Sequence, residues 1–346
     1  MSEIVFRNSA VSVRKRLVFC DAFTKEQVML VSKDLGKQIL ERITVLFAKR
    51  LAGKLLGVFL ASLVPLVVHS EQIPPSYPWH LVNFWWDCVS VKGTPFESLK
   101  YRIKISGKTN AGDSLYIAPV GHAKIGGIQL YAGIQTDVYG WRSLSDRTII
   151  NHGRGGIFSR WALPGERLSP DYLSGEKLSF FEVASYEGHF ASVRHPHSWS
   201  EGEYEFELAA VPKNGRSESW IEASITDIAT NIKTIIGRIN FSGKNLTFEP
   251  GFASFIEVYG GDRRRLPEVT VAFKQPTLNG RSCGTTNVYV VVPKNDRSEG
   301  IRFVDTSVVD SWVIAKISSR KLEPYVTDFR LPLYSNDPSK RSSSAF

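Results

Sequence analysis

The segment Lys100–Ile105 has the sequence KYRIKI, and the segment Glu203–Leu208 has the sequence EYEFEL. In both segments, charged and apolar side chains alternate over six positions. Successive side chains of a β-strand point to opposite faces of the sheet, so this period of two predicts strands with one face in the core and one in water. Because the two segments carry opposite charges, they are candidates for neighbouring strands joined by cross-strand ion pairs.

Similar short runs continue along the chain, separated by turn clusters such as Gly107–Asp113 and Pro212–Gly215. No alternating helices and no fixed repeat accompany them, which predicts an all-β fold, a two-sheet β-sandwich of the jelly-roll type. The further predicted strands are Leu81–Val91, Ile125–Val138, Gly156–Ala162, Leu178–Tyr186, Phe190–Arg194, Ser219–Asp227, Lys233–Phe241, Phe252–Tyr259, Glu268–Lys274, Val288–Val292, Ile301–Asp305 and Trp312–Ile317.

The sandwich is predicted to span residues 71–333 as a single domain, with an N-terminal extension over 1–70 and a flexible tail over 334–346. The loop Gly260–Arg265 is the best candidate for an internal boundary. The segment after this loop is short and rich in strands, so we expect it to add strands to the same sandwich.

The N-terminal extension contains an uncharged run of 14 residues, Leu55–Val68, preceded by Lys49, Arg50 and Lys54. As a helix it would reach about 21 Å, short of the roughly 30 Å hydrocarbon core of a bilayer. The pattern predicts a secretory signal cleaved near Ser70–Glu71, and hence a secreted or periplasmic protein. The alternative is an uncleaved membrane anchor over 55–68. A signal rarely has some fifty residues before its apolar run, which favours a translation start later than Met1.

The net charge of +9 is concentrated in this extension. Residues 1–54 hold 11 basic and five acidic side chains, so the remaining 292 residues carry only +3. A charge this close to neutral does not indicate a surface that binds nucleic acid. Contact with a membrane is expected only through the N-terminal segment.

Beyond Cys20 in the extension, the chain has two cysteines, Cys88 and Cys283. In an oxidising compartment they could pair and close a loop of about 195 residues. The alternative is two separate buried thiols, since Cys is among the most buried residue types.

Motifs for catalysis or metal binding are lacking: there is no His-Glu-x-x-His motif, no Gly-x-Ser-x-Gly motif and no metal-binding cysteine pair. His195 and His197 could bind a transition metal if a third ligand such as His152 or His122 came near. Pro196 breaks the strand that would hold both rings on one face, so we predict no metal and no cofactor. The carboxylates of Glu201–Glu207 alternate along a strand and are expected in water rather than at a catalytic site. No catalytic residue is assigned.

Aromatic residues give the strongest binding signal. Tryptophans expected at strand ends or in loops can stack on sugar rings while neighbouring Arg and His side chains donate hydrogen bonds. The predicted ligand-binding residues are Trp141, Arg160, Trp161, Arg194, His195 and Trp199, with Trp220 as a further surface tryptophan. Core burial is the competing interpretation for each tryptophan, and Trp79, Trp85, Trp86 and Trp312 are expected in the core.

Several short motifs resemble the secreted bacterial domain-of-unknown-function family numbered 3472. They are Gly127–Thr136, Gly156–Trp161, Gly188–Pro196 with Trp199, Gly202 and Tyr204, and Phe252–Tyr259, within roughly Trp79–Gly261. The resemblance implies a lectin-type, concanavalin-like sandwich that faces glycans, and it carries over no catalytic residue.

We therefore expect a secreted β-sandwich that binds carbohydrate or another polar extracellular ligand. The alternatives are a polysaccharide-active hydrolase or lyase on the same fold and a surface module that binds another protein.

Overall fold

The computed structural model describes residues 79–185, 188–213, 216–243, 246–259, 266–293, 302–322 and 328–333. The predicted signal segment, the loop Gly260–Arg265 and the predicted tail lie outside the described residues. Within the described ranges, no helix has the length and apolar character to cross a membrane.

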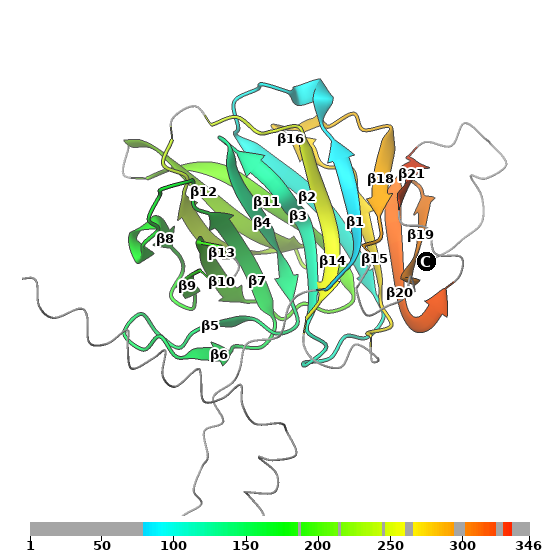
Figure 1. Cartoon of the computed structure of the whole chain (residues 1–346), viewed down its shortest axis with the longest axis horizontal. Coiled ribbons are helices and arrows are strands. Elements are labelled where there is room, and N and C mark those ends of the chain that lie inside the picture. The colour runs from blue at the N-terminus through cyan, green and yellow to red at the C-terminus, as the bar shows by residue number, and fades with distance from the viewer. Residues whose placement is uncertain are drawn as a thin grey trace, which may run out of the picture. The chain divides into compact units, whose positions relative to one another are not determined.

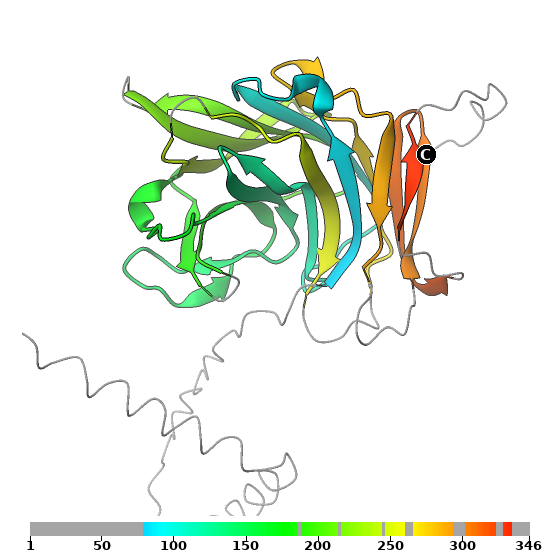
Figure 2. The same cartoon turned by 45° about the horizontal axis from the view of Figure 1, so that its top comes forward.

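Two antiparallel sheets lie face to face (Figures 1 and 2). In spatial order, sheet I contains β21 (Asp328–Pro332), β18 (Asn287–Val291), β1 (Trp79–Asp87), β14 (Gly251–Val258), β3 (Leu115–Ile125), β4 (Ile128–Gln135), β7 (Gly155–Trp161), β10 (Phe190–Pro196) and β9 (Phe180–Ala184). Sheet II contains β19 (Arg302–Val309), β20 (Trp312–Leu322), β15 (Thr270–Lys274), β2 (Ser98–Ser106), β11 (Gly202–Lys213), β12 (Arg216–Asp227), β13 (Ile232–Asn240) and β8 (Leu173–Ser174).

Smaller elements complete the fold. The short strands β16 (Thr277–Leu278) and β17 (Arg281–Ser282) join sheet II beside β2. The strands β5 (Tyr139–Trp141) and β6 (Ile149–Asn151) form a separate hairpin near β9, seen at one end of the sandwich in Figure 1. The predicted all-β, two-sheet sandwich is confirmed.

The core fills the space between the sheets with the inward side chains of both. A buried polar contact joins the sheets at its centre: Ser254 of β14 accepts a hydrogen bond from Trp86 Nε1 at 2.9 Å and lies 2.8 Å from the Tyr101 hydroxyl of β2. The Ser254 hydroxyl also donates to the Pro119 carbonyl at 2.6 Å. These bonds satisfy polar groups that would be costly to bury unpaired.

The pairing of the two alternating segments is confirmed. Strand β2 pairs with β11, which places Arg102 opposite Glu205 and Lys100 opposite Glu207 on the outer face of sheet II. Arg102 Nε lies 3.2 Å from a Glu205 carboxylate oxygen, and Lys100 Nζ lies 3.4 Å from one of Glu207. The glutamates of β11 are therefore paired and solvent-facing, as the alternation predicts.

The structure corrects the predicted strands at one central position. Strand β3 lies in the middle of sheet I, yet no strand was predicted over most of its length. Residues 115–121 are buried without alternation and contain Pro119, which explains why a period of two fails to detect them. The predicted strand Ile125–Val138 divides into the end of β3, a turn at Gly126 and Gly127 with positive φ, and β4.

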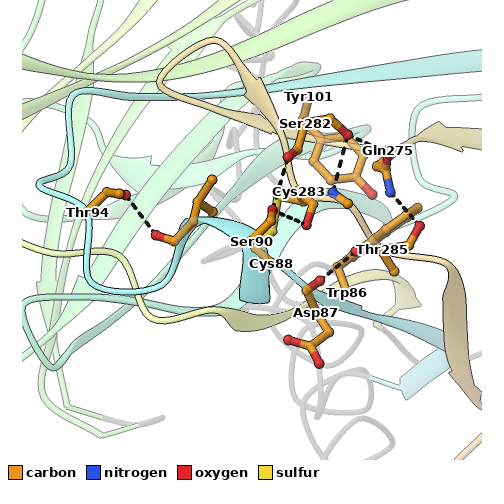
Figure 3. The surroundings of a disulfide bond; sticks show 12 residues. Trp86, Asp87, Cys88, Ser90, Thr94, Tyr101, Gln275, Ser282, Cys283 and Thr285 are labelled. Atoms are coloured by element: carbon orange, nitrogen blue, oxygen red, sulfur yellow. Dashed lines mark hydrogen bonds between the residues drawn. A yellow bond between two sulfur atoms is a disulfide. The ribbon is translucent and has the colours of Figure 1, made fainter.

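Cys88 and Cys283 form a disulfide with a Cα–Cα distance of 4.2 Å (Figure 3). Both cysteines are buried, just after β1 and just before β18. Side chains around the bond hold the same two segments together, since Ser90 Oγ donates to the Cys283 carbonyl at 2.7 Å and Thr285 Oγ1 donates to the Asp87 carbonyl at 2.8 Å. Of the two alternatives left open by the sequence, the structure contains the paired one.

Candidate ligand-binding face

The outer faces of the two sheets differ in chemistry. The outer face of sheet II carries charged side chains in cross-strand ion pairs, such as Glu222 with Arg238 and Glu207 with Lys233. The outer face of sheet I carries aromatic rings in contact with one another. The solvent side of an antiparallel sheet is ordinarily polar. The aromatic outer face of sheet I is therefore unusual and is the candidate for a binding surface.

A second apolar cluster lies on sheet I, on the side away from the core. It consists of Tyr116, Ala118, Ile157 and Phe255, with Tyr131 and Tyr259 packed against it. The neighbours of these residues along the strands, Ile117, Phe158 and Ile256, point into the sandwich core. Alternation along each strand thus gives sheet I two apolar faces.

One end of this surface is formed by β7 and β4. The Trp161 and Tyr131 rings lie 4.4 Å apart between centroids, and both side chains are partly exposed. Tyr131 contacts Tyr116 at 5.8 Å, and Tyr116 contacts Phe255 of β14 edge-on at 5.3 Å. The geometry is that of favourable edge-to-face aromatic pairs.

The other end is formed by β1 and β3. The His80 ring lies 4.5 Å from Phe255 and 5.8 Å from His122. His122 in turn stacks on Trp85 at 5.7 Å with 16° between the ring planes. Trp85 is 37% exposed, which corrects its expected place in the core. We call the continuous set Trp161, Tyr131, Tyr116, Phe255, His80, His122 and Trp85 the aromatic band.

Gly133 of β4 makes room for the band. A Cβ at this position would lie 2.2 Å from the Ile117 carbonyl oxygen and 2.8 Å from the Tyr116 ring. Backbone atoms cannot move aside at low cost, so only glycine lets the Tyr116 ring lie this close to β4.

Polar groups interrupt the aromatic surface. His80 Nε2 lies 2.9 Å from a Glu257 carboxylate oxygen, and His80 Nδ1 lies 3.0 Å from Asn83 Oδ1. The buried Tyr116 hydroxyl has no hydrogen-bond partner among the described residues. Burial raises the pKa of Tyr116 well above its usual value, so this hydroxyl keeps its proton at neutral pH.

His122 is held in an uncommon backbone conformation, with φ of 50° where the register of β3 shifts. A left-handed conformation costs a non-glycine residue about 1–2 kcal/mol, and such positions cluster at functional sites. Burial, and to a lesser extent the nearby His80, lower the pKa of His122. The ring is therefore neutral at pH 7 and offers one donor and one acceptor nitrogen.

The structure brings two of the sequence-predicted site residues to this face. Trp161 belongs to the aromatic band, and Arg194 of β10 lies on the same outer side. Arg194 is 5% exposed and forms an ion pair of 2.5 Å with Glu182 of β9, while also donating to the Tyr139 carbonyl. Arg194 is therefore a buried, structural residue of this face.

Arg160 and His195 lie on the inner side of sheet I. Arg160 directly precedes the outer residue Trp161, and His195 directly follows the outer residue Arg194. Alternation along each strand therefore turns both side chains to the inner face. The Arg160 guanidinium is fully buried, where it pairs with Glu166 and donates to the Asn240 carbonyl at 2.7 Å. His195 Nδ1 lies 2.8 Å from the Pro196 carbonyl oxygen.

The remaining predicted tryptophans are buried away from the aromatic band. Trp199 is 2% exposed in the core and donates from Nε1 to the Gln135 carbonyl at 3.1 Å. Trp141 is buried in the β5–β6 hairpin beneath the Arg147 guanidinium, 4.8 Å from its ring. Trp220 lies within β12 and is buried, and Trp86 is in the core as predicted.

Sequence reasoning did not assign Tyr131, His80 or Glu257 to a site, and it considered His122 only as a possible metal ligand. Tyr131 carried a usable signal, because it alternates with the core residues Leu130 and Ala132. Nothing in the sequence places His80 beside Glu257, because 176 residues lie between them in the chain and only the pairing of β1 with β14 brings them together.

Among the described residues, no group of three or more His, Cys, Asp or Glu side chains is arranged to hold a metal ion. No known family model matches the chain, and no characterised protein is significantly similar to it in sequence.

Proposed function

We propose that the outer face of sheet I binds carbohydrate. The observation that carries the proposal is the aromatic band: the outer face of a sheet carries the exposed or partly exposed rings Tyr131, Trp161 and Trp85, with hydrogen-bonding groups among them. A sugar ring has apolar C–H faces, which stack on aromatic rings, and a rim of hydroxyls, which need donors and acceptors. Tyr131 and Trp161 offer the first, and His122 and the ion pair of His80 with Glu257 offer the second.

We also propose that the protein is exported. The Cys88–Cys283 disulfide supports it, because disulfides form and persist in oxidising compartments. Membership of the secreted family that the sequence resembles is likewise only proposed, and the proposed ligand does not depend on it.

The test is a glycan array followed by affinity measurements on the purified protein. Trp161→Ala and Tyr131→Ala are each expected to weaken binding about tenfold or more, since a few aromatic contacts usually contribute most of the affinity at such sites. The matched control is Trp312→Ala, a partly buried tryptophan of sheet II whose ring lies 5.2 Å from Lys274 Nζ. Unchanged binding by both band variants, or no binding of the wild type to any glycan, contradicts the proposal.

A polysaccharide-cleaving activity on this face is the second candidate. It is favoured by Glu257, a carboxylate only 7% exposed, which pairs with His80, and by the strained and neutral His122, whose ring lies 5.8 Å from that of His80. Release of new reducing ends from a bound polysaccharide, lost in Glu257→Gln with binding retained, would establish it. If the glycan is bound but no new reducing ends are released, the face binds carbohydrate without cleaving it.

A further inference from the structure

We propose that the bound carbohydrate is an extended, neutral polysaccharide chain that lies across the strands of sheet I and contacts two separate aromatic platforms. This inference rests on the proposed function and specifies its ligand. The first platform is Tyr131 with Trp161. The second platform is Trp85 with Tyr289, flanked by His122.

Among the aromatic side chains of sheet I whose exposure the structure describes, those of the second platform are the most exposed. Trp85 of β1 and Tyr289 of β18 are directly opposite each other in the strand register. Their side chains are 37% and 39% exposed, although they are large and apolar. His122 stacks on Trp85, which extends the flat surface toward β14 and β3. Two adjacent exposed rings on one face form a surface on which a sugar chain can lie.

The two platforms are too far apart for a small ligand. Strands β7 and β1 are separated by three intervening strands, β4, β3 and β14, and therefore by about 19 Å at about 4.8 Å per strand. From Trp161 to Tyr289 the same spacing gives about 24 Å. A monosaccharide is no wider than an indole ring system, so it covers one platform only. Only a chain of several sugars reaches both.

The surface between the platforms suits the middle of such a chain. Tyr116 and Phe255, at 1% and 2% exposure, are more deeply buried than the rings on either side. Beside them lies the ion pair of Glu257 with His80, whose imidazole is the more exposed partner at 25%. A hydroxyl of a bridging sugar can hydrogen-bond to this pair, which a purely apolar ligand could not do.

The charges beside the band favour a neutral polymer. Glu257 is offset by His80, and the exposed rim at Tyr289 carries one acid and one base, Asp328 and Arg330. Tyr289 donates from its hydroxyl to Asp328 at 2.5 Å, which fixes the ring beside Trp85. An anionic polymer would need an excess of Arg and Lys along its path, whereas the basic side chains Arg194 and Lys124 on this face are each paired with an acid.

The experiment uses the full-length protein in native gels that contain one soluble polysaccharide each. The neutral probes are hydroxyethylcellulose, galactomannan, xylan, laminarin and pullulan, and the anionic probes are polygalacturonate, alginate and heparin. Oligosaccharides of the retarding polymer, from two to eight sugars, are then titrated by calorimetry. We expect affinity to rise by about 100-fold between fragments that cover one platform and fragments that span both, as for linked binding sites.

Two variants separate the platforms. In Trp85→Ala and Tyr289→Ala, the rise with chain length should disappear while the affinity for the shortest binding fragments stays unchanged. Both side chains are exposed, so their truncation leaves the core intact, and thermal melting checks this. Trp312→Ala is again the matched control and should keep the full rise.

The outcomes distinguish this inference from the proposed function. Equal affinity for short and long fragments, no effect of Trp85→Ala and Tyr289→Ala, or retardation by anionic polymers alone overturns the inference and leaves carbohydrate binding standing. Absence of binding to every polymer and every glycan on the array overturns both. A length-dependent rise that is lost in the second-platform variants supports both.

Discussion

Glu182 and Arg194 form an ion pair on the outer side of sheet I in which both side chains are almost fully buried. Removing one charge of a buried pair leaves the other without compensation. We expect Glu182→Gln to lower the free energy of unfolding by about 3–5 kcal/mol, measured by urea denaturation. Glu249→Gln, which breaks the exposed pair with Lys124, is the control and should cost less than about 1 kcal/mol. Equal losses in the two variants would contradict the structural role of the buried pair.

Three histidines make stability depend on pH. Burial lowers the pKa of His122, His152 and His197, so each is less protonated in the folded state than in the unfolded chain. The unfolded state therefore binds more protons as pH falls through the ordinary imidazole pKa of about 6.5, and stability is lost in that direction. The Tm should fall between pH 7.5 and pH 5, above the range in which carboxylates titrate. In His197→Asn the fall of the Tm with decreasing pH should be smaller. An unchanged fall in both His197→Asn and His152→Asn would contradict this prediction.

At the scale of the strand, alternation explains both the successes and the errors of sequence reasoning. It located β2 and β11 and their ion pairs, because each has one charged and one apolar face. It failed on β3, because a strand buried on both faces has no period of two. Residues next to each other in sequence, such as Arg160 with Trp161 and Arg194 with His195, were grouped as one site although they point to opposite faces of the sheet.

The charged row between β2 and β11 gives a prediction at this scale. Glu205→Lys places a base opposite Arg102 and beside Lys100, and we expect it to cost about 0.5–1 kcal/mol. The double variant Arg102→Glu with Glu205→Lys restores opposite charges and should recover most of the loss. Urea denaturation of the wild type, the two single variants and the double variant measures the coupling, and additive losses would show that the row contributes nothing by pairing.

Across the whole molecule, the disulfide joins segments 195 residues apart in sequence. The chain-entropy model gives a stabilisation of about 5 kcal/mol for a loop of this length. We expect Cys88→Ala with Cys283→Ala to lower the Tm and the urea midpoint strongly, and reduction of the wild type to have a similar effect. An unchanged Tm after reduction, with two free thiols counted, would contradict this prediction.

The sequence alone determined the strands with one polar face, the two-sheet sandwich they form and the opposite charges that match β2 to β11. These features depend on alternation within a few consecutive residues, which the sequence displays directly. Only the tertiary structure decided which residues form the proposed ligand-binding face. Its rings come from β1, β3, β4, β7, β14 and β18, which are scattered from residue 79 to residue 291. They lie side by side because of non-local strand pairing, and no local pattern specifies which strand becomes the neighbour of which.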